Sequence, residues 1–495
     1  MIKALLTFLL IIFLTLPLFA QTLSVDTAWV RRYNGPEDST DVPHGLSVDG
    51  SGNVYVAGWS EKPGRSYATV KYYSNGDTAW VRTYSVPEKA YNTLTAMAID
   101  SSGNVYVTGF YVVLGSIHFV DYAYLTVKYY SNGDTAWVRR YGEGPEDKAN
   151  AIAVENSGNV YVTGYGGTIK YDSSGTQVWY SSWGGGHIYL DNSANIYVVS
   201  AATAEYVTIK YYSNGDTAWV RRYDGPSNQA AYAYAMAIDS SGNVYVTGSG
   251  HVSGTYNYDY ATVRYYPNGD TAWVRTYDGT GNSWDGAYAV AVDDSGNVYV
   301  TGRCAQLPDS PWNWDYVTIK YYSNGDTAWV RRYSGSGNEG DEAHAIAIDH
   351  SGYAYVTGWS TGSGTGYDYV TIKYYSNGDT AWVKRYNGPG NGWDQAYIIN
   401  VDGSGSVYVT GQSTGVGTGL DYATIKYVQF LRGDVNQDKS VTVADIVYLV
   451  SYLFKHGPAP TPIQSGDANC DGKVTISDIV YLVAYLFKHG PAPCI

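Results

Sequence analysis

The stretch SNGDTAWV, residues 74–81, decides the fold because the chain repeats it letter for letter. Identical copies begin at Ser131, Ser213, Ser323 and Ser376, and a variant, PNGDTAWV, begins at Pro267. The Asn-Gly pair is typical of a two-residue hairpin loop, which takes residues that tolerate positive φ. The Thr, Trp and Val that follow favour a β-strand. We interpret the stretch as scaffold, since a catalytic group is not needed in every repeat.

Each copy belongs to a longer unit of four short phrases. One unit reads AMAI (96–99), NVYVTG (104–109), LTVKYY (125–130) and TAWVRRY (135–141), with Gly, Asn, Asp and Ser between the phrases. Such phrases predict short strands joined by hairpins. The phrase ending in tryptophan occurs eight times, with Trp29, Trp80, Trp137, Trp179, Trp219, Trp273, Trp329 and Trp382. Four-strand units at this spacing are typical of propeller blades, so we predict an all-β, eight-bladed β-propeller.

The two ends of the repeat region predict how the ring closes. The first phrase, DTAWVRRY (26–33), is a fourth strand, whereas the last, YATIKYV (422–428), is a third strand. The N-terminal strand would therefore complete the last blade and remove an open edge. We expect the propeller to span residues 21–428. Its units resemble the β-propeller repeats of secreted bacterial proteins, called SBBP repeats, a resemblance that implies a fold and little else.

The N-terminus carries the signature of export. Lys3 precedes a run without charge from Ala4 to Ala20, which predicts a signal peptide of residues 1–20. The alternative is an uncleaved membrane anchor, because the run approaches the length that spans a bilayer. We expect a secreted or cell-surface chain with no membrane attachment after cleavage. A formal charge of −14 argues against a nucleic-acid partner.

The connections at one end of the blades are long and differ from unit to unit, and such loops usually carry recognition. The tryptophans placed in this ligand face are Trp59, Trp284, Trp312, Trp314, Trp359 and Trp393. Aromatic rings among carboxylates and amides suit stacking on sugars or docking a protein. We therefore predict that this face binds an extracellular glycan or protein. The alternative is that the rings cover the ends of their own blades.

No catalytic residues stand out in the sequence. The eight histidines are scattered, and no G-x-S-x-G, H-E-x-x-H or P-loop pattern occurs. A carboxylate pair assembled from loops of different blades stays open, so a glycoside hydrolase or lyase is the enzymatic alternative. A quinoprotein dehydrogenase is a weaker competitor. The phrase YDSSGTQVWY (171–180) is similar to the repeated phrase of that family, but the other copies depart from it.

After a linker, residues 429–433, a twelve-residue motif occurs twice in residues 434–495, as DVNQDKSVTVAD and DANCDGKVTISD. Oxygen ligands at alternating positions are what Ca²⁺ prefers in such a loop, so we predict two calcium sites. The predicted ligands of the first site are Asp434, Asn436, Asp438, the Ser440 carbonyl and Asp445. Those of the second are Asp467, Asn469, Asp471, the Lys473 carbonyl and Asp478.

The sixth loop position distinguishes the two motifs. It is Gly472 in the second loop but Lys439 in the first. Positive φ costs a residue with a side chain about 1 kcal/mol or more, so we predict that the first site is weaker. Cys470 and Cys494 are candidates for a disulfide, which would leave Cys304 unpaired.

Each loop leads into a helix with an apolar stripe, and no helix precedes it. Two such halves with Asp at loop position 12 resemble a type I dockerin, from Gly433 to Pro493. The resemblance implies folding on Ca²⁺ and docking to a cohesin-bearing scaffold protein. It also implies that loop positions 10 and 11 help to select the cohesin; here they are Val443, Ala444, Ile476 and Ser477. The alternative is a calcium-bound cap without a partner.

These features favour an exported, non-catalytic binding protein that is attached to a scaffold through its dockerin. Polysaccharide degradation is the context that the family implies. The competing hypothesis is a carbohydrate-active propeller enzyme with the same attachment.

Overall fold

The computed structural model describes residues 23–62, 64–86, 91–113, 121–200, 204–252, 257–279, 284–305, 313–336, 339–488 and 490–494. The predicted signal peptide and Trp312 lie outside these ranges. The chain separates into two compact units, residues 29–426 and the remainder of the two chain ends.

The described residues form eight four-stranded antiparallel sheets, each a blade of the predicted propeller. Blade 1 contains β2 (Asp41–Val48), β3 (Val54–Lys62), β4 (Gly64–Tyr72) and β5 (Thr78–Tyr84). Blade 2 contains β6 (Asn92–Ile99), β7 (Val105–Val113), β8 (Asp121–Tyr129) and β9 (Thr135–Gly144). Blade 3 contains β10 (Ala149–Val154), β11 (Val160–Gly164), β12 (Gly167–Tyr171) and β13 (Gln177–Ser181). Blade 4 contains β14 (His187–Leu190), β15 (Ile196–Ser200), β16 (Tyr206–Tyr211) and β17 (Thr217–Tyr223).

The second half of the ring repeats this order. Blade 5 contains β18 (Ala231–Ile238), β19 (Val244–His251), β20 (Tyr258–Tyr265) and β21 (Thr271–Tyr277). Blade 6 contains β22 (Gly286–Val292), β23 (Val298–Ala305), β24 (Trp314–Tyr321) and β25 (Thr327–Tyr333). Blade 7 contains β26 (Asp341–Ile348), β27 (Ala354–Thr361), β28 (Tyr367–Tyr374) and β29 (Thr380–Tyr386). Blade 8 contains β30 (Asp394–Val401), β31 (Val407–Thr414), β32 (Leu420–Phe430) and β1 (Ser24–Tyr33).

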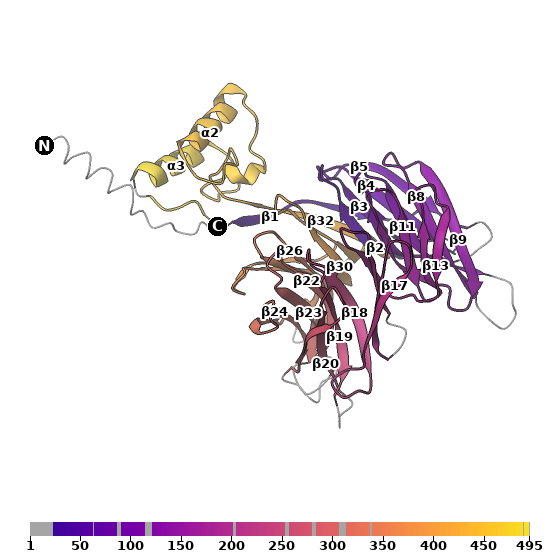
Figure 1. The fold of residues 1–495 in the computed structure, drawn as a ribbon. Coiled ribbons are helices and arrows are strands. Elements are labelled where there is room, and N and C mark those ends of the chain that lie inside the picture. The colour runs from indigo at the N-terminus through magenta and orange to yellow at the C-terminus, as the bar shows by residue number, and fades with distance from the viewer. Residues whose placement is uncertain are drawn as a thin grey trace. The chain divides into compact units, whose positions relative to one another are not determined.

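The ring closes as the sequence predicts. In blade 8 the strand order is β1-β32-β31-β30, so the first strand of the chain pairs with the last. Figure 1 shows β1, in indigo, beside β32, in orange. The first strands of successive blades contact one another around the ring, including β30 with β2. The eight-bladed fold is therefore confirmed.

The repeated tryptophan and the arginine two residues after it explain why the same stretch returns in each blade. Trp29 Nε1 donates to the Ser74 carbonyl at 3.2 Å, and Arg31 Nε donates to the Gly76 carbonyl at 2.6 Å. Gly76 has φ 88°, and a Cβ added there would meet the Trp29 ring at 2.9 Å. Six further links of this kind run from the tryptophans at 80, 137, 179, 219, 273 and 329 to the hairpin turn of the next blade. Each SNGD turn therefore also binds the tryptophan of the preceding blade.

The C-terminal unit contains α2 (Val443–Lys455), a 3₁₀ turn η1 (Ile463–Gly466) and α3 (Ile476–Lys488). The two helices pack on each other over a small core that includes Leu449 and Leu482, both fully buried. Thr442 caps α2, and His456 ends it with a left-handed backbone just before the Gly-Pro pair of the sequence. The small core is consistent with a domain that needs a metal or a covalent link for stability.

Candidate functional site

The first predicted calcium loop gathers its carboxylates around one point. One oxygen from each of Asp434, Asp438 and Asp445 lies within 4.8 Å of the others. A Ca²⁺ ion about 2.4 Å from each oxygen permits spacings up to about 4.8 Å, which is twice the metal–oxygen distance. Burial, together with the charges of Asp445 and Asp438, raises the pKa of Asp434. Carboxylates held together in this way fit a divalent cation.

Asp445 connects this loop to the helix that follows. Its Oδ1 accepts a hydrogen bond from the Val435 backbone N–H at 2.7 Å, and its Oδ2 accepts one from the Thr442 N–H at 2.8 Å. The Asp445 side chain is fully buried, and it forms a capping box with Thr442 at the start of α2. An ion held by Asp445 would therefore order the loop and the helix together.

The second loop repeats the hydrogen bonds of the first. Asp467 Oδ1 accepts from the Asp471 N–H at 3.1 Å, and Asp478 Oδ2 accepts from the Thr475 N–H at 2.8 Å. Asn436 and Asn469 accept from the residue two positions later in the same way, and Ser440 and Lys473 donate to the carboxylate two positions earlier. Within the described residues, the second loop brings its carboxylates less closely together than the first. The donor set of each loop, three carboxylates and an amide, fits Ca²⁺.

The backbone of both loops turns at matching positions. Gln437 and Cys470 have φ of 63° and 60°, and Lys439 and Gly472 have φ of 69° and 83°. The positive φ expected at the sixth position is therefore present in both loops. An added Cβ at Gly472 would meet nothing within 4 Å. The two loops therefore share this backbone conformation, and they differ at the sixth position in the strain that it imposes on a residue with a Cβ rather than in crowding.

A disulfide joins Cys470 of the second loop to Cys494 near the end of the chain, with a sequence separation of 24. Cys304 is a buried free thiol in blade 6. The pairing considered from the sequence is thus present. The disulfide links the end of the chain to the second loop. The Cys494 backbone N–H also donates to the Ala468 carbonyl of this loop at 3.3 Å.

Two of the tryptophans predicted for the ligand face are buried. Trp59 and Trp359 are 8% and 7% exposed, and their indole N–H groups donate to Nε2 of His44 and His344 at 3.0 Å. Burial and the nearby charge of Arg65 lower the pKa of His44 to about 4, so its neutral ring accepts this hydrogen bond. These two rings cover the ends of their own blades, which is the alternative that the sequence left open.

Other tryptophans of the same face remain accessible. Trp393 and Trp284 are 61% and 46% exposed, and their rings lie against Tyr367 and Tyr258 at 6.0 and 5.6 Å. Trp314 stacks against the guanidinium group of Arg303 at 3.8 Å. The face therefore offers two exposed indole rings on supporting tyrosines.

Sequence reasoning missed a row of side chains on the first strands. Seven of these strands carry a β-bulge at the same place, and the bulged residues are His44, Thr95, Asn150, Tyr234, Tyr288, His344 and Tyr397. Four consecutive rings, those of Tyr234, Tyr288, His344 and Tyr397, contact from blade to blade at 5.4, 6.0 and 5.5 Å. We call these four residues the aromatic row.

A charged pair adjoins the aromatic row. Arg303 forms an ion pair with Glu342, and Glu342 lies 3.2 Å from His344 Nε2. Burial lowers the pKa of His344. The sequence did hold a signal for the row, because PHGL, AYAM, AYAV, AHAI and AYII place His or Tyr at the same position of successive first phrases. The contacts between these rings depend on the β-bulges, and sequence patterns do not reveal where bulges occur.

Family models match both parts of the chain. The model of the SBBP β-propeller repeat matches residues 28–61, 218–254 and 328–364. The model of the dockerin type I domain matches residues 432–487. The C-terminal segment is a type I dockerin domain. A dockerin implies binding to a cohesin, and proteins with dockerins are generally extracellular or on the cell surface. No helix within the described residues is long and apolar enough to cross a bilayer.

Further relatives show only distant likeness. An uncharacterised WD repeat-containing protein of Acanthamoeba polyphaga mimivirus is 23% identical over 210 residues, which are 36% of this chain and 14% of that protein. Among solved structures, a polysaccharide lyase is 10% identical, with 80% of this chain and 91% of that one covered and a TM-score of 0.44. A dihydro-haem d1 dehydrogenase is 12% identical, with coverage of 78% and 74% and a TM-score of 0.45. An ancestral GH74 enzyme is 14% identical, with 66% of this chain and 46% of that one covered and a TM-score of 0.41. These values are too low to assign a reaction.

The dockerin presents exposed apolar side chains at matching positions of its two helices. They are Val443 (50% exposed), Val447 (63%) and Phe454 (60%) on α2, and Ile476 (61%), Val480 (62%) and Phe487 (63%) on α3. The four residues predicted for partner selection lie at the exposed starts of these helices. The valines and phenylalanines further along were not among the residues predicted for partner selection, although their spacing of four and eleven residues marks one helical face.

Proposed function

We propose that this protein is an exported binding module: the dockerin attaches it to a cohesin-bearing scaffold, and the ligand face of the propeller binds an extracellular glycan, with polysaccharide breakdown as its setting. The observation that carries the proposal is the repeated apolar stripe on α2 and α3, three exposed side chains on each helix. Large exposed apolar side chains at two symmetric positions are costly in water and suit a protein partner.

The propeller end supports the binding part of the proposal. Trp393 and Trp284 expose their indole rings, and the aromatic row adds four rings in contact from blade to blade. Aromatic faces bind sugar rings through their apolar sides, while neighbouring polar groups pair with hydroxyls. The ion pair of Arg303 with Glu342 holds polar groups beside the row.

The test uses the full chain in calcium on a panel of insoluble and soluble polysaccharides. We expect retention without turnover, and about thirtyfold weaker retention for Trp284→Ala with Trp393→Ala, since each of the two stacked rings contributes about 1 kcal/mol. The matched control is Tyr322→Ala, because Tyr322 is 52% exposed but lies in the turns at the opposite end of the blades. Turnover would make the protein a carbohydrate-active enzyme. Equal retention of the variants would refute the assigned face.

A further inference from the structure

Three blades share an ion pair between their two outer strands, and a fourth has the same two residue types at these positions. An acidic residue at or just before the start of the third strand faces an arginine of the fourth strand. The ion pairs are Asp421 with Arg32 (2.8 Å), Glu205 with Arg222 (2.6 Å) and Asp368 with Arg385 (2.6 Å). In blade 6, Asp315 occupies the acidic position and its charge acts on Arg332. The arginine compensates an acid that is buried in three of these blades. Such compensation matters because an unpaired buried charge is strongly destabilising.

Blade 5 breaks this pattern. Asp259 occupies the acidic position, but Thr276 occupies the position of the arginine in the same strand register. Asp259 is 8% exposed. Its carboxylate has neither an ion pair nor a hydrogen bond within the part of the chain that the structure describes. A carboxylate that is nine-tenths buried and lacks a partner requires a cation or a proton from solution.

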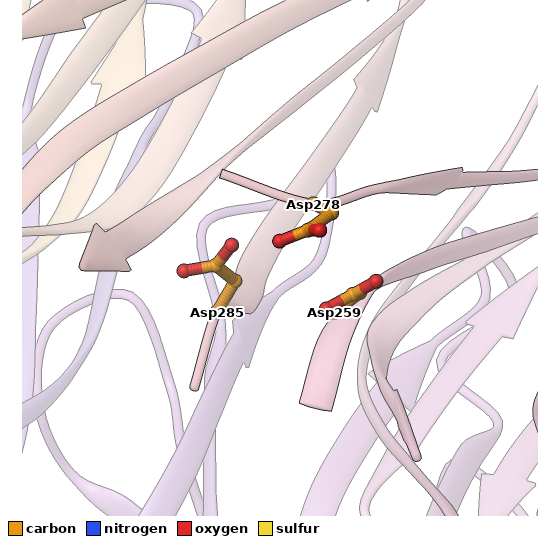
Figure 2. A group of neighbouring side chains, drawn as sticks. All are labelled: Asp259, Asp278 and Asp285. Atoms are coloured by element: carbon orange, nitrogen blue, oxygen red, sulfur yellow. The ribbon is translucent and has the colours of Figure 1, made fainter. Parts of the chain in front are cut away.

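Two further acids, not a base, accompany Asp259. One oxygen from each of Asp259, Asp278 and Asp285 lies within 4.8 Å of the others, and Figure 2 shows the three side chains gathered from separate segments. Asp278 follows β21 and is exposed, whereas Asp285 precedes β22 of the next blade and is 1% exposed. The positions equivalent to Asp278 in other blades are uncharged in all but blade 4. Blade 5 therefore adds an acid where it lacks the arginine.

Hydrogen bonds with three backbone segments hold Asp285 in its place within this cluster. Its Oδ2 accepts a hydrogen bond from the Gly279 N–H at 2.6 Å, and its Oδ1 accepts one from the Ala305 N–H at 2.9 Å. Its own N–H donates to the Tyr258 carbonyl at 2.7 Å, next to Asp259. The cluster therefore bridges the outer strands of blade 5 and the first strand of blade 6.

The arginine of blade 6 is already engaged by partners in blades 5 and 6. Arg332 faces Asp315 and donates to the Tyr277 hydroxyl and the Cys304 sulfur at 3.2 and 3.3 Å. Burial and the charges of Asp278 and Asp285 raise the pKa of Asp259 to about 7. Three carboxyl groups therefore lie close together, and the negative charge of each disfavours the ionised form of the others.

We propose that Asp259, Asp278 and Asp285 bind a hard divalent cation, best Ca²⁺, which replaces the missing arginine and joins blade 5 to blade 6. An all-oxygen donor set selects a hard ion. Oxygens that lie within 4.8 Å of one another can share one Ca²⁺ ion at metal–oxygen distances of about 2.4 Å. Mg²⁺ is less suited, because it requires near-ideal octahedral geometry. Exposed Asp278 leaves one side open to water, which completes the coordination shell.

The test counts bound Ca²⁺ on the full chain by elemental analysis after dialysis, and measures the propeller's melting temperature by calorimetry with calcium and with chelator. We expect Asp259→Asn and Thr276→Arg each to bind one ion fewer than the wild type. Calcium should raise the melting temperature of the wild-type propeller, because it binds the folded state. The Thr276→Arg propeller should melt at the same temperature with calcium and with chelator, since the arginine restores the pair of the other blades.

The control is Asp294→Asn, which removes an acid that is 81% exposed and should leave the ion count unchanged. Counts of bound ions do not depend on the cohesin or on any glycan, so this test is separate from the proposed function. If Asp259→Asn fails to fold, Thr276→Arg decides alone. Equal ion counts in the wild type and Thr276→Arg, with no effect of calcium on the propeller, would overturn the proposal.

Discussion

Replacing Lys439 by glycine should tighten the first calcium loop about fivefold. Lys439 has φ of 69°, a conformation that costs a residue with a Cβ about 1–2 kcal/mol. Glycine removes this cost, but it loses more conformational entropy when the loop becomes ordered, which offsets the gain by about 0.5–1 kcal/mol. The net gain of about 1 kcal/mol corresponds to about fivefold in Kd. The Lys439 side chain is exposed, so its loss removes little packing.

The second loop provides the mirror experiment. Gly472→Ala forces a side chain into φ of 83° without any steric clash, since nothing lies within 4 Å of the new Cβ. It should weaken the second loop by about the same factor. Calcium titrations of the full chain, followed by circular dichroism at 222 nm, report α2 and α3 because the propeller is built from strands. The Asp467→Asn background removes calcium binding by the second loop so that the first loop can be titrated alone. The Asp434→Asn background allows the second loop to be titrated in the same way.

The reasoning fails if Lys439→Gly leaves the calcium midpoint of the first loop unchanged or raises it. It also fails if Gly472→Ala has no effect on the second loop. Either result would mean that backbone strain at the sixth position does not set the affinity of these loops. The prediction that the first site is the weaker of the two would then lose its physical basis.

Other predictions concern stability and pH. Trp329→Ala should destabilise the propeller by about 3–5 kcal/mol in calorimetry, whereas Trp393→Ala, which removes a ring that is 61% exposed, should change it by less than about 0.5 kcal/mol. Reducing the disulfide of Cys470 and Cys494 should lower the stability of the dockerin in urea by about 3 kcal/mol, because the bond closes a loop of 24 residues. Burial raises the pKa of Asp41 to about 6, so the folded state favours its protonated form and the propeller should lose stability as pH rises from about 4 to 6. Asp41→Asn should remove that slope, and parallel pH profiles of the two chains would contradict the assignment.

The fold was largely predictable because each unit carries its own local signals. The Asn-Gly turns, the alternating strands and the displaced fourth strand at residues 26–33 are properties of short segments, and they agree with the global topology. The calcium loops are equally local, since ligand spacing is fixed along the chain. The helix ends and the positive φ at Lys439 and Gly472 follow from the same patterns.

What the sequence did not reveal depends on contacts between units. Trp59 and Trp359 lie within β3 and β27, where they are buried and donate their N–H to a histidine on the neighbouring strand, whereas Trp393 lies just before β30 and is exposed. The cluster at Asp259 becomes visible only when strand register shows Thr276 in the place of an arginine. Such features arise from pairing between strands, which no single segment encodes.

The most direct test of the account is sedimentation of the full chain with a protein that carries type I cohesins, in calcium and in chelator. The account predicts a one-to-one complex per cohesin in calcium, its loss in chelator, and its return when calcium is restored. Val447→Asp with Val480→Asp, which places charge on the exposed apolar stripe of both helices, should abolish the complex while calcium still orders the helices. A complex that persists in chelator, or the absence of a complex with every type I cohesin in calcium, would contradict it.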